Sequence, residues 1–347
     1  MAYGSINADV IGTSVQGYSL GAGNSSLMKN KIINGAMVID QRNAGASVTL
    51  SGDNTFDVDR WAGWGGGGTG GASKFTMQQN AGSVTPPVGF VNYCGITSSS
   101  AYTVATGDYY AFSQQIEGFN VADLQWGTAN AKTVTLSFWV YSSLTGTFGG
   151  SLANSARNRS YPFTYSISVA NTWTQISVTI AGDTTGTWLT TNGAGIRLNF
   201  GLGVGATYVG TAGSWSANNY WSATGCVNVV STNAATFYIT GVQLEVGSSA
   251  TGFEYVNYQT SLANCQRYYY KPDASAGTFL GSFYNNTLTR ASIIFPFHVP
   301  MRTAPSVTYT LTQGTANTDY LTVDSAQIYI NTTTYAAASA FTASAEL

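Results

Sequence analysis

Apolar and polar residues alternate in several short stretches of the chain. Residues 134–141, 176–180 and 196–200 each place Val, Leu, Ile or Phe at every second position. A period of two predicts β-strands that bury one face in a core. Glycine-rich turns separate these runs, as in antiparallel all-β proteins. We therefore predict an all-β fold, with an antiparallel two-sheet β-sandwich over residues 30–271.

The first 29 residues lack this pattern. Their apolar side chains are scattered among Gly, Ser and Asn, and no period of 2 or 3.6 is sustained. Such a segment is either a disordered tail or an extended N-terminal arm that orders against a partner. We favour the arm because its apolar residues are unusual in a solvated tail. The candidates for docking are Val10, Ile11, Val15 and Leu20.

The alternating pattern restarts after Pro272. Five short apolar runs between residues 279 and 331 predict strands, and nearby prolines place some of them at sheet edges. We predict a small C-terminal β domain over 272–347. The Ala/Ser/Thr-rich tail from Ala336 onward is predicted to be poorly ordered.

Two local features interrupt the strand pattern. A short helix is predicted around residues 261–268, with Thr260 or Ser261 as its cap. The glycine-rich run 63–71 is predicted to be a loop that carries Trp64.

Composition narrows the possible functions. Only 8% of the residues are charged, against about 25% in a typical globular domain, and the net charge is −2. We therefore expect no binding to nucleic acid and no membrane insertion. Contents of 44% hydrophobic and 13% aromatic residues argue against disorder. A near-neutral β-rich monomer with open sheet edges would aggregate, so we expect a homo-oligomer.

Catalytic side chains are scarce. The chain has a single histidine, His298, and four glutamates, which leaves little material for a histidine triad or a pair of catalytic carboxylates. We expect no enzyme activity and no cofactor. The three cysteines, at widely spaced positions, are expected to be buried thiols. Asp53, Asp57 and Asp59 offer oxygen donors for a structural calcium ion, and they are our candidate ligands for one.

Residues 208–221 are dense in side chains that suit saccharides. Flat aromatic rings pack on the C–H faces of sugars, and planar polar groups bind the hydroxyls. The alternative is that these aromatic residues fill one end of the sandwich or a subunit interface. The saccharide-contact candidates are Tyr208, Trp215, Asn218, Asn219, Tyr220, Trp221 and the more distant Trp64.

Two motifs bracket the predicted sandwich. The first is NKIINGAMVIDQR at residues 30–42, followed by Asp59-Arg60-Trp61. The second lies in residues 237–271 and has the pattern ItGvQLEvG…aT.FE…CQRYY.K. Together they resemble the start and the closing strand of a jelly-roll module of bacteriophage tail-fibre and related virion surface proteins.

This resemblance implies a function at the virion surface. The sandwich would be a jelly roll, the N-terminal arm would dock to other virion proteins of the tail or baseplate, and three copies would assemble. The module would mediate adhesion to a host-surface glycan. A capsid decoration or head-fibre protein remains an alternative, and a polysaccharide depolymerase is a second one. No signal peptide or apolar membrane span is evident, so we expect synthesis in the host cytoplasm and a final location on the virion.

Overall fold

A computed structural model of the protein describes residues 29–67, 71–272, 281–283, 291–311, 316–330 and 336–347. The predicted docking residues Val10, Ile11, Val15 and Leu20 lie outside these ranges. The chain forms two compact units; the first ends at Val256 and the second begins at Asn257. The short helix thus belongs to the second unit, whereas the sequence-based boundary after residue 271 places it in the first. No helix among the described residues is long and apolar enough to cross a membrane.

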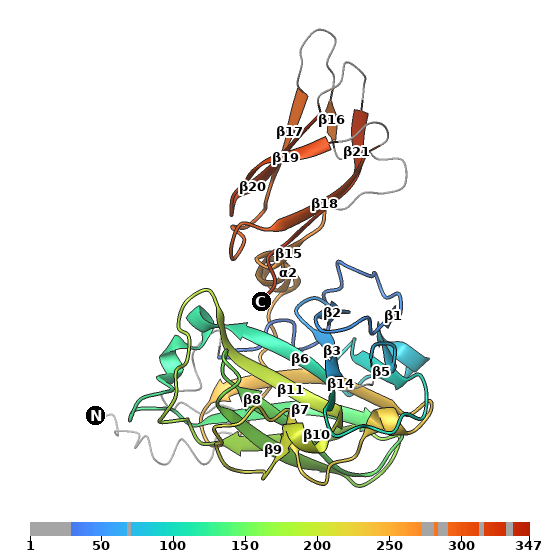
Figure 1. Ribbon diagram of the computed structural model, residues 1–347, viewed down its shortest axis with the longest axis vertical. Helices are drawn as coiled ribbons and strands as arrows, with labels where there is room; N and C mark the ends of the chain where they lie inside the picture. Colours follow the sequence, from blue (N-terminus) through green and yellow to red (C-terminus); the bar gives the residue numbers. More distant parts are fainter. Residues whose placement is uncertain (1–28, 68–70, 273–280, 284–290, 312–315, 331–335) are drawn as a thin grey trace, which may run out of the picture. The chain divides into compact units, whose positions relative to one another are not determined.

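The first unit is a sandwich of two six-stranded antiparallel sheets (Figure 1). Both sheets mix strands from the beginning and the end of this unit, as in a jelly roll, and the predicted fold class is confirmed. In order, sheet one contains β1 (Val48–Thr49), β4 (Phe75–Gln79), β5 (Cys94–Ser98), β14 (Thr236–Val246), β7 (Val134–Ser142) and β10 (Thr174–Ile180). Sheet two contains β2 (Thr55–Phe56), β3 (Ala62–Gly67), β6 (Asp108–Glu117), β11 (Ala194–Val204), β8 (Gly146–Ala153) and β9 (Ser160–Ile167).

Aromatic rings fill the space between the two sheets. Phe138 of β7 meets Phe200 of β11 edge to face, with ring centroids 5.0 Å apart. Trp61, which is fully buried, stacks on Phe112 of β6 at 5.1 Å. Burial of apolar surface stabilises by about 25 cal/mol per Å², so these large rings contribute much of the stability of the sandwich.

The closing strand β14 contains a bulge that shifts its faces. Gly241 has φ +62°, and the pairing with β7 shifts between Thr240 and Gln243. Phe237 and Ile239 face the core before the bulge, and Val242 and Leu244 face it afterwards. The unbroken alternation of the sequence would have put these two pairs on opposite faces. The inserted residue brings both apolar pairs inward.

The glycine-rich run is a strand over most of the described part, so the loop prediction is wrong there. β3 pairs with β6 from Ala62 to Gly67. A Cβ at Gly65 would lie 2.3 Å from Leu50 Cδ2, and one at Gly63 would lie 2.9 Å from Met77 Cε. Glycine is required at these core-facing positions because the larger side chains of Leu50 and Met77 fill the space.

The second unit is a small β domain with its own core. Helix α2 (Tyr258–Gln266) is capped by Asn257, whose side chain accepts from Thr260 N–H. The cap therefore lies before the two predicted residues, Thr260 and Ser261. Phe295 and Phe341 stack at 4.3 Å within the core. The strands are β15 (Tyr269–Tyr270), β16 (Gly281–Phe283), β17 (Ala291–Pro296), β18 (Ser306–Leu311), β19 (Ala316–Leu321), β20 (Ser325–Ile330) and β21 (Ala336–Ser344).

The C-terminal tail is strand β21, so the prediction of poor order is wrong. β21 pairs with β15, β16 and β18 and is central in its sheet. Its small side chains at Ala338 and Ala343, and Ala345 just after it, are buried in one cluster with Phe341. Short side chains suit a central strand whose neighbours supply the larger ones.

Candidate functional site

The outer face of sheet two carries an aromatic cluster. Trp64 lies opposite Ala111 in the pairing of β3 with β6, and both face away from the core. The segment after β11 folds back over this face: a Cβ added at Gly149 or Gly201 would lie 2.8 Å from Ser222 Oγ. Within this segment, β12 (Val209–Gly210) and β13 (Ser222–Ala223) form a parallel pair. Trp221, which directly precedes β13, is thereby brought against Trp64.

Four rings form this group, which we call the Trp64 cluster: Trp64, Tyr109, Tyr208 and Trp221. Trp64 and Trp221 have centroids 5.6 Å apart and are 5% and 2% exposed. Tyr109 stacks on Trp221 at 4.6 Å with an interplanar angle of 19°. Tyr208 meets Tyr109 edge to face at 5.4 Å. Both tyrosines are half-buried, so they form the accessible part of the cluster.

Two arginines lie over the indole rings. Arg157 Cζ, from the β8–β9 turn, is 4.9 Å from the ring centroids of both Trp64 and Trp221. Arg197 Cζ, from β11, is 5.9 Å from the Trp64 centroid. These distances are typical of cation–π contacts. Burial and then the charge of Arg157 lower the pKa of Arg197 to about 10, so its guanidinium stays charged at neutral pH.

One carboxylate borders the cluster. Asp53 Oδ2 accepts from Tyr109 O–H at 2.8 Å, and Oδ1 accepts from Gly65 N–H at 3.3 Å. Burial, followed by this bond to Asp53, raises the pKa of Tyr109 to about 12. The hydroxyl therefore stays protonated across the physiological range and can donate to Asp53.

The predicted saccharide-contact residues divide into separate groups. Tyr208, Trp221 and Trp64 meet in the cluster, whereas Trp215 packs with Trp126 and Trp188. Trp215 Nε1 donates to Ala181 O at 2.8 Å.

The amide candidates lie near the tip of the same segment. Asn218 is exposed, and its Nδ2 donates to Tyr220 Oη at 3.1 Å and to Ser216 Oγ at 2.9 Å; Asn219 is half-buried. Sequence reasoning missed Tyr109, Arg157 and Arg197. The alternation along β6 and β11 is the signal that places Tyr109 and Arg197 outward.

The three candidate calcium ligands do not come together. Asp53 is exposed beside Tyr109, whereas Asp57 is buried and accepts from Cys94 Sγ at 3.1 Å. Asp59 accepts from the side chain of Gln41. Burial raises the pKa of Asp57 to about 7 and that of Asp59 to about 6. Among the residues that the structure describes, no three His, Cys, Asp or Glu side chains are grouped to hold a metal.

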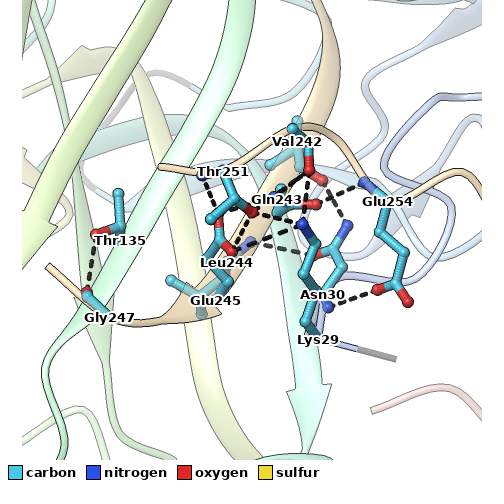
Figure 2. Close-up of polar contacts among 11 residues, drawn as sticks. Lys29, Asn30, Thr135, Val242, Gln243, Leu244, Glu245, Gly247, Thr251 and Glu254 are labelled. Atoms are coloured by element: carbon cyan, nitrogen blue, oxygen red, sulfur yellow. Dashed lines mark hydrogen bonds and ion pairs between the residues drawn. The ribbon is translucent and has the colours of Figure 1, made fainter. Parts of the chain in front are cut away.

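The two sequence motifs meet in a polar network at the end of β14 (Figure 2). Asn30 Oδ1 accepts from Leu244 N–H at 3.0 Å, and Asn30 Nδ2 donates to Val242 O at 3.1 Å. Asn30 N–H donates to Glu254 Oε2 at 2.8 Å. The first motif is therefore joined to the second through hydrogen bonds to the backbone of the closing strand.

Glu245 is the buried carboxylate of this network. Its Oε1 accepts from Gln243 Nε2 at 2.9 Å and from Thr251 N–H at 2.8 Å. Its Oε2 accepts from Thr251 Oγ1 at 2.6 Å and lies 3.9 Å from Lys29 Nζ. The side chain is 1% exposed. Both oxygens thus hold the segment after β14 in place.

Comparisons with known proteins found only distant structural similarity. No protein-family model matches the chain, and no curated protein matches it in sequence. The enzymatically active domain of tailspike protein 4 from bacteriophage CBA120 is similar at 13% identity and TM-score 0.35, over 63% of this chain and 22% of that domain. A family 11 carbohydrate-binding module from Clostridium thermocellum, in complex with a mixed-linked β-1,3-1,4 tetrasaccharide, is similar at 14% identity and TM-score 0.29, over 59% of this chain and 98% of the module. The modules of xylanase 10B from Clostridium thermocellum, complexed with xylohexaose, are similar at 14% identity and TM-score 0.28, over 60% of this chain and 30% of the xylanase chain.

Proposed function

We propose that this chain is a virion surface protein of bacteriophage tail-fibre type that binds a saccharide and catalyses no reaction. The Trp64 cluster is the observation that carries the saccharide part. It places two half-buried tyrosine rings beside two guanidinium groups and one carboxylate on the outer face of a sheet. Rings that pack on C–H faces, together with directed polar groups, are what a sugar site requires.

The accessible part of the cluster is small, and this fits a multivalent mode of binding. Tyr109 and Tyr208 are half-buried, while the buried Trp221 stacks on Tyr109 and packs against Trp64. A single site of this size binds weakly. Several copies held in one oligomer raise the avidity through effective concentration. We include a homotrimer in the proposal for this reason.

The positions of the acidic residues support a non-catalytic function. Glycoside hydrolysis needs two carboxyl groups about 5 to 10 Å apart on either side of the scissile bond. Glu245 is buried with both oxygens engaged, and Glu254 is engaged by Asn30 N–H. Asp57 has a pKa suited to a general acid, but its side chain is fully buried beside Cys94. The depolymerase alternative would need a different pair.

The virion part of the proposal is supported by the two motifs. Asn30, Gln243 and Glu245 are motif residues, and they form the network that joins the beginning and the end of the jelly roll (Figure 2). Phage surface proteins with these motifs use an N-terminal arm for docking. Electron microscopy of particles carrying gold-labelled antibody to this protein would test the assignment. Label on the tail is expected, and label on the head would favour capsid decoration.

Binding can be tested on an array of neutral and acidic glycans. The wild-type chain is expected to bind at least one glycan, and Tyr208→Ala is expected to remove that signal. Tyr141→Ala is the matched control, because Tyr141 is also a half-buried ring that contacts a neighbouring tyrosine, Tyr238, but in sheet one. Absence of binding to every glycan, or equal loss in both variants, would overturn the proposed site.

A further inference from the structure

Neither arginine of the Trp64 cluster is paired with a carboxylate among the described residues. Arg157 and Arg197 contact the indole rings, and no ion pair or hydrogen bond of their guanidinium groups is formed within that part of the chain. The chain has 13 basic and 15 acidic residues in total, so acidic partners are available elsewhere. Asp53, the carboxylate that borders the cluster, accepts from Tyr109 O–H and Gly65 N–H instead of from the arginines. Two guanidinium groups that are not paired with a carboxylate of the described residues are therefore a specific feature of this face.

A neighbouring arginine shows what the paired state looks like. Arg159, two residues after Arg157, donates from Nε to Asp183 Oδ2 at 2.7 Å and from Nη2 to Asp183 Oδ1 at 2.8 Å. The planar guanidinium binds both carboxylate oxygens at once, which is its strongest common interaction. Within the described ranges, no carboxylate takes the place of Asp183 beside Arg157 or Arg197.

Buried donors at the cluster also lack acceptors. Arg197 Nε and Trp221 Nε1 are buried atoms without a hydrogen-bond partner among the described residues. A buried donor left without an acceptor is destabilising, because nothing replaces the hydrogen bond that it made to water. Arg197 is further disfavoured by the like charge of Arg157, which contributes to its lowered pKa. An anion bound by the two guanidinium groups would relieve the repulsion between them.

We infer that the saccharide taken by this site carries a carboxylate, as a uronic acid does. Its carboxylate binds the guanidinium groups of Arg157 and Arg197, while its ring packs on the accessible tyrosines. The inference rests on the proposed saccharide binding and adds the class of sugar. A nucleic acid strand is a poorer fit, because two cations on a chain of net charge −2 make no extended basic groove.

The test compares polysaccharides before and after removal of the charge. Polygalacturonate, alginate and hyaluronan, together with neutral galactan, are tested for binding by the full chain. Each acidic polymer is also converted chemically to its carboxyl-reduced form, which is neutral but keeps the sugar ring. Binding to at least one acidic polymer is expected, with a loss of about tenfold or more on carboxyl reduction.

Substitutions of the two arginines test whether they bind the carboxylate of the polymer. Arg197→Gln and, independently, Arg157→Gln are expected to weaken binding of the acidic polymer about tenfold or more. Arg157 lies in a turn and is half-exposed, so its replacement leaves the sheets intact. Lys132→Gln is the control, since it removes one exposed positive charge from another part of the surface.

The outcomes separate the inference from the proposed function. Equal binding of acidic and carboxyl-reduced polymers, with no effect of either arginine variant, would overturn the inference and leave saccharide binding intact. Failure to bind any polymer would overturn both. Tighter binding of a thymidine oligonucleotide that depends on Arg197 would overturn the inference in favour of nucleic acid.

Discussion

The side chain of Asn30 acts as a neighbouring strand for Leu244. Its Oδ1 accepts from Leu244 N–H at 3.0 Å, and Leu244 O accepts from the next residue, Lys31 N–H, at 2.8 Å. β5 pairs with β14 only as far as Ile239. The N-terminal segment therefore completes the hydrogen bonding of β14 after the bulge, where β5 has ended.

Replacement of Asn30 by Ala should destabilise the sandwich. Leu244 N–H and Val242 O would lose their partner, and both residues are fully buried. We expect a loss of about 1–3 kcal/mol in the free energy of unfolding, measured by denaturant titration. Asn218→Ala, at an exposed amide, is the control and should change stability by less than about 0.5 kcal/mol. Equal effects of the two variants would contradict the role assigned to Asn30.

Glu245→Gln distinguishes a structural carboxylate from a catalytic one. The amide nitrogen of the new side chain would face Thr251 or Gln243, each of which now donates to the carboxylate. A loss of about 1–3 kcal/mol in unfolding free energy is expected, with saccharide binding unchanged. A stable variant that loses the ability to degrade a polysaccharide would instead support the depolymerase alternative.

The sequence was sufficient to predict the sandwich but not its local irregularities. Alternation in residues 134–141 and 176–180 identified β7 and β10 because each strand keeps a strict period of two. The same rule failed in β14, because a bulge adds one residue at Gly241 and exchanges the faces. The loop prediction failed in β3, where Gly65 is needed because a larger side chain would collide with Leu50. No local sequence pattern connects Leu50 to the glycine-rich run.

The candidate site was predictable only where its residues are close together in the sequence. Composition identified Tyr208 and Trp221, since aromatic residues concentrate in one segment. Tyr109 and Arg157 come from different strands and turns, and only the pairing of β3, β6, β11 and β8 brings them together. Composition also grouped Trp215 with Trp221, although the two rings pack in different clusters.

Trp221 should matter for stability as well as for binding. Its ring is 2% exposed and contacts Trp64 and Tyr109. Trp221→Ala is expected to cost about 3–5 kcal/mol, by analogy with other large-to-small replacements of buried rings. Trp221→Phe keeps a ring on Tyr109 and loses no hydrogen bond within the described chain, so it should cost less. A Trp221→Ala variant as stable as the wild type would show that the ring is not packed as described.

Stability should fall as the pH rises from 5 to 8. Burial raises the pKa of Asp57 to about 7 and that of Asp59 to about 6, above the usual value of 3.8. The folded state therefore binds more protons than the unfolded state between about pH 4 and pH 7. The stabilising contribution of protonated Asp57 and Asp59 is complete below their pKa in the unfolded state. It is lost as the pH rises through their pKa in the folded state. Thermal unfolding should give a higher Tm at pH 5 than at pH 8, and Asp57→Asn should reduce that difference by stabilising the protein at pH 8. A wild-type Tm that rises between pH 5 and pH 8, or a slope that Asp57→Asn leaves unchanged, would contradict this account.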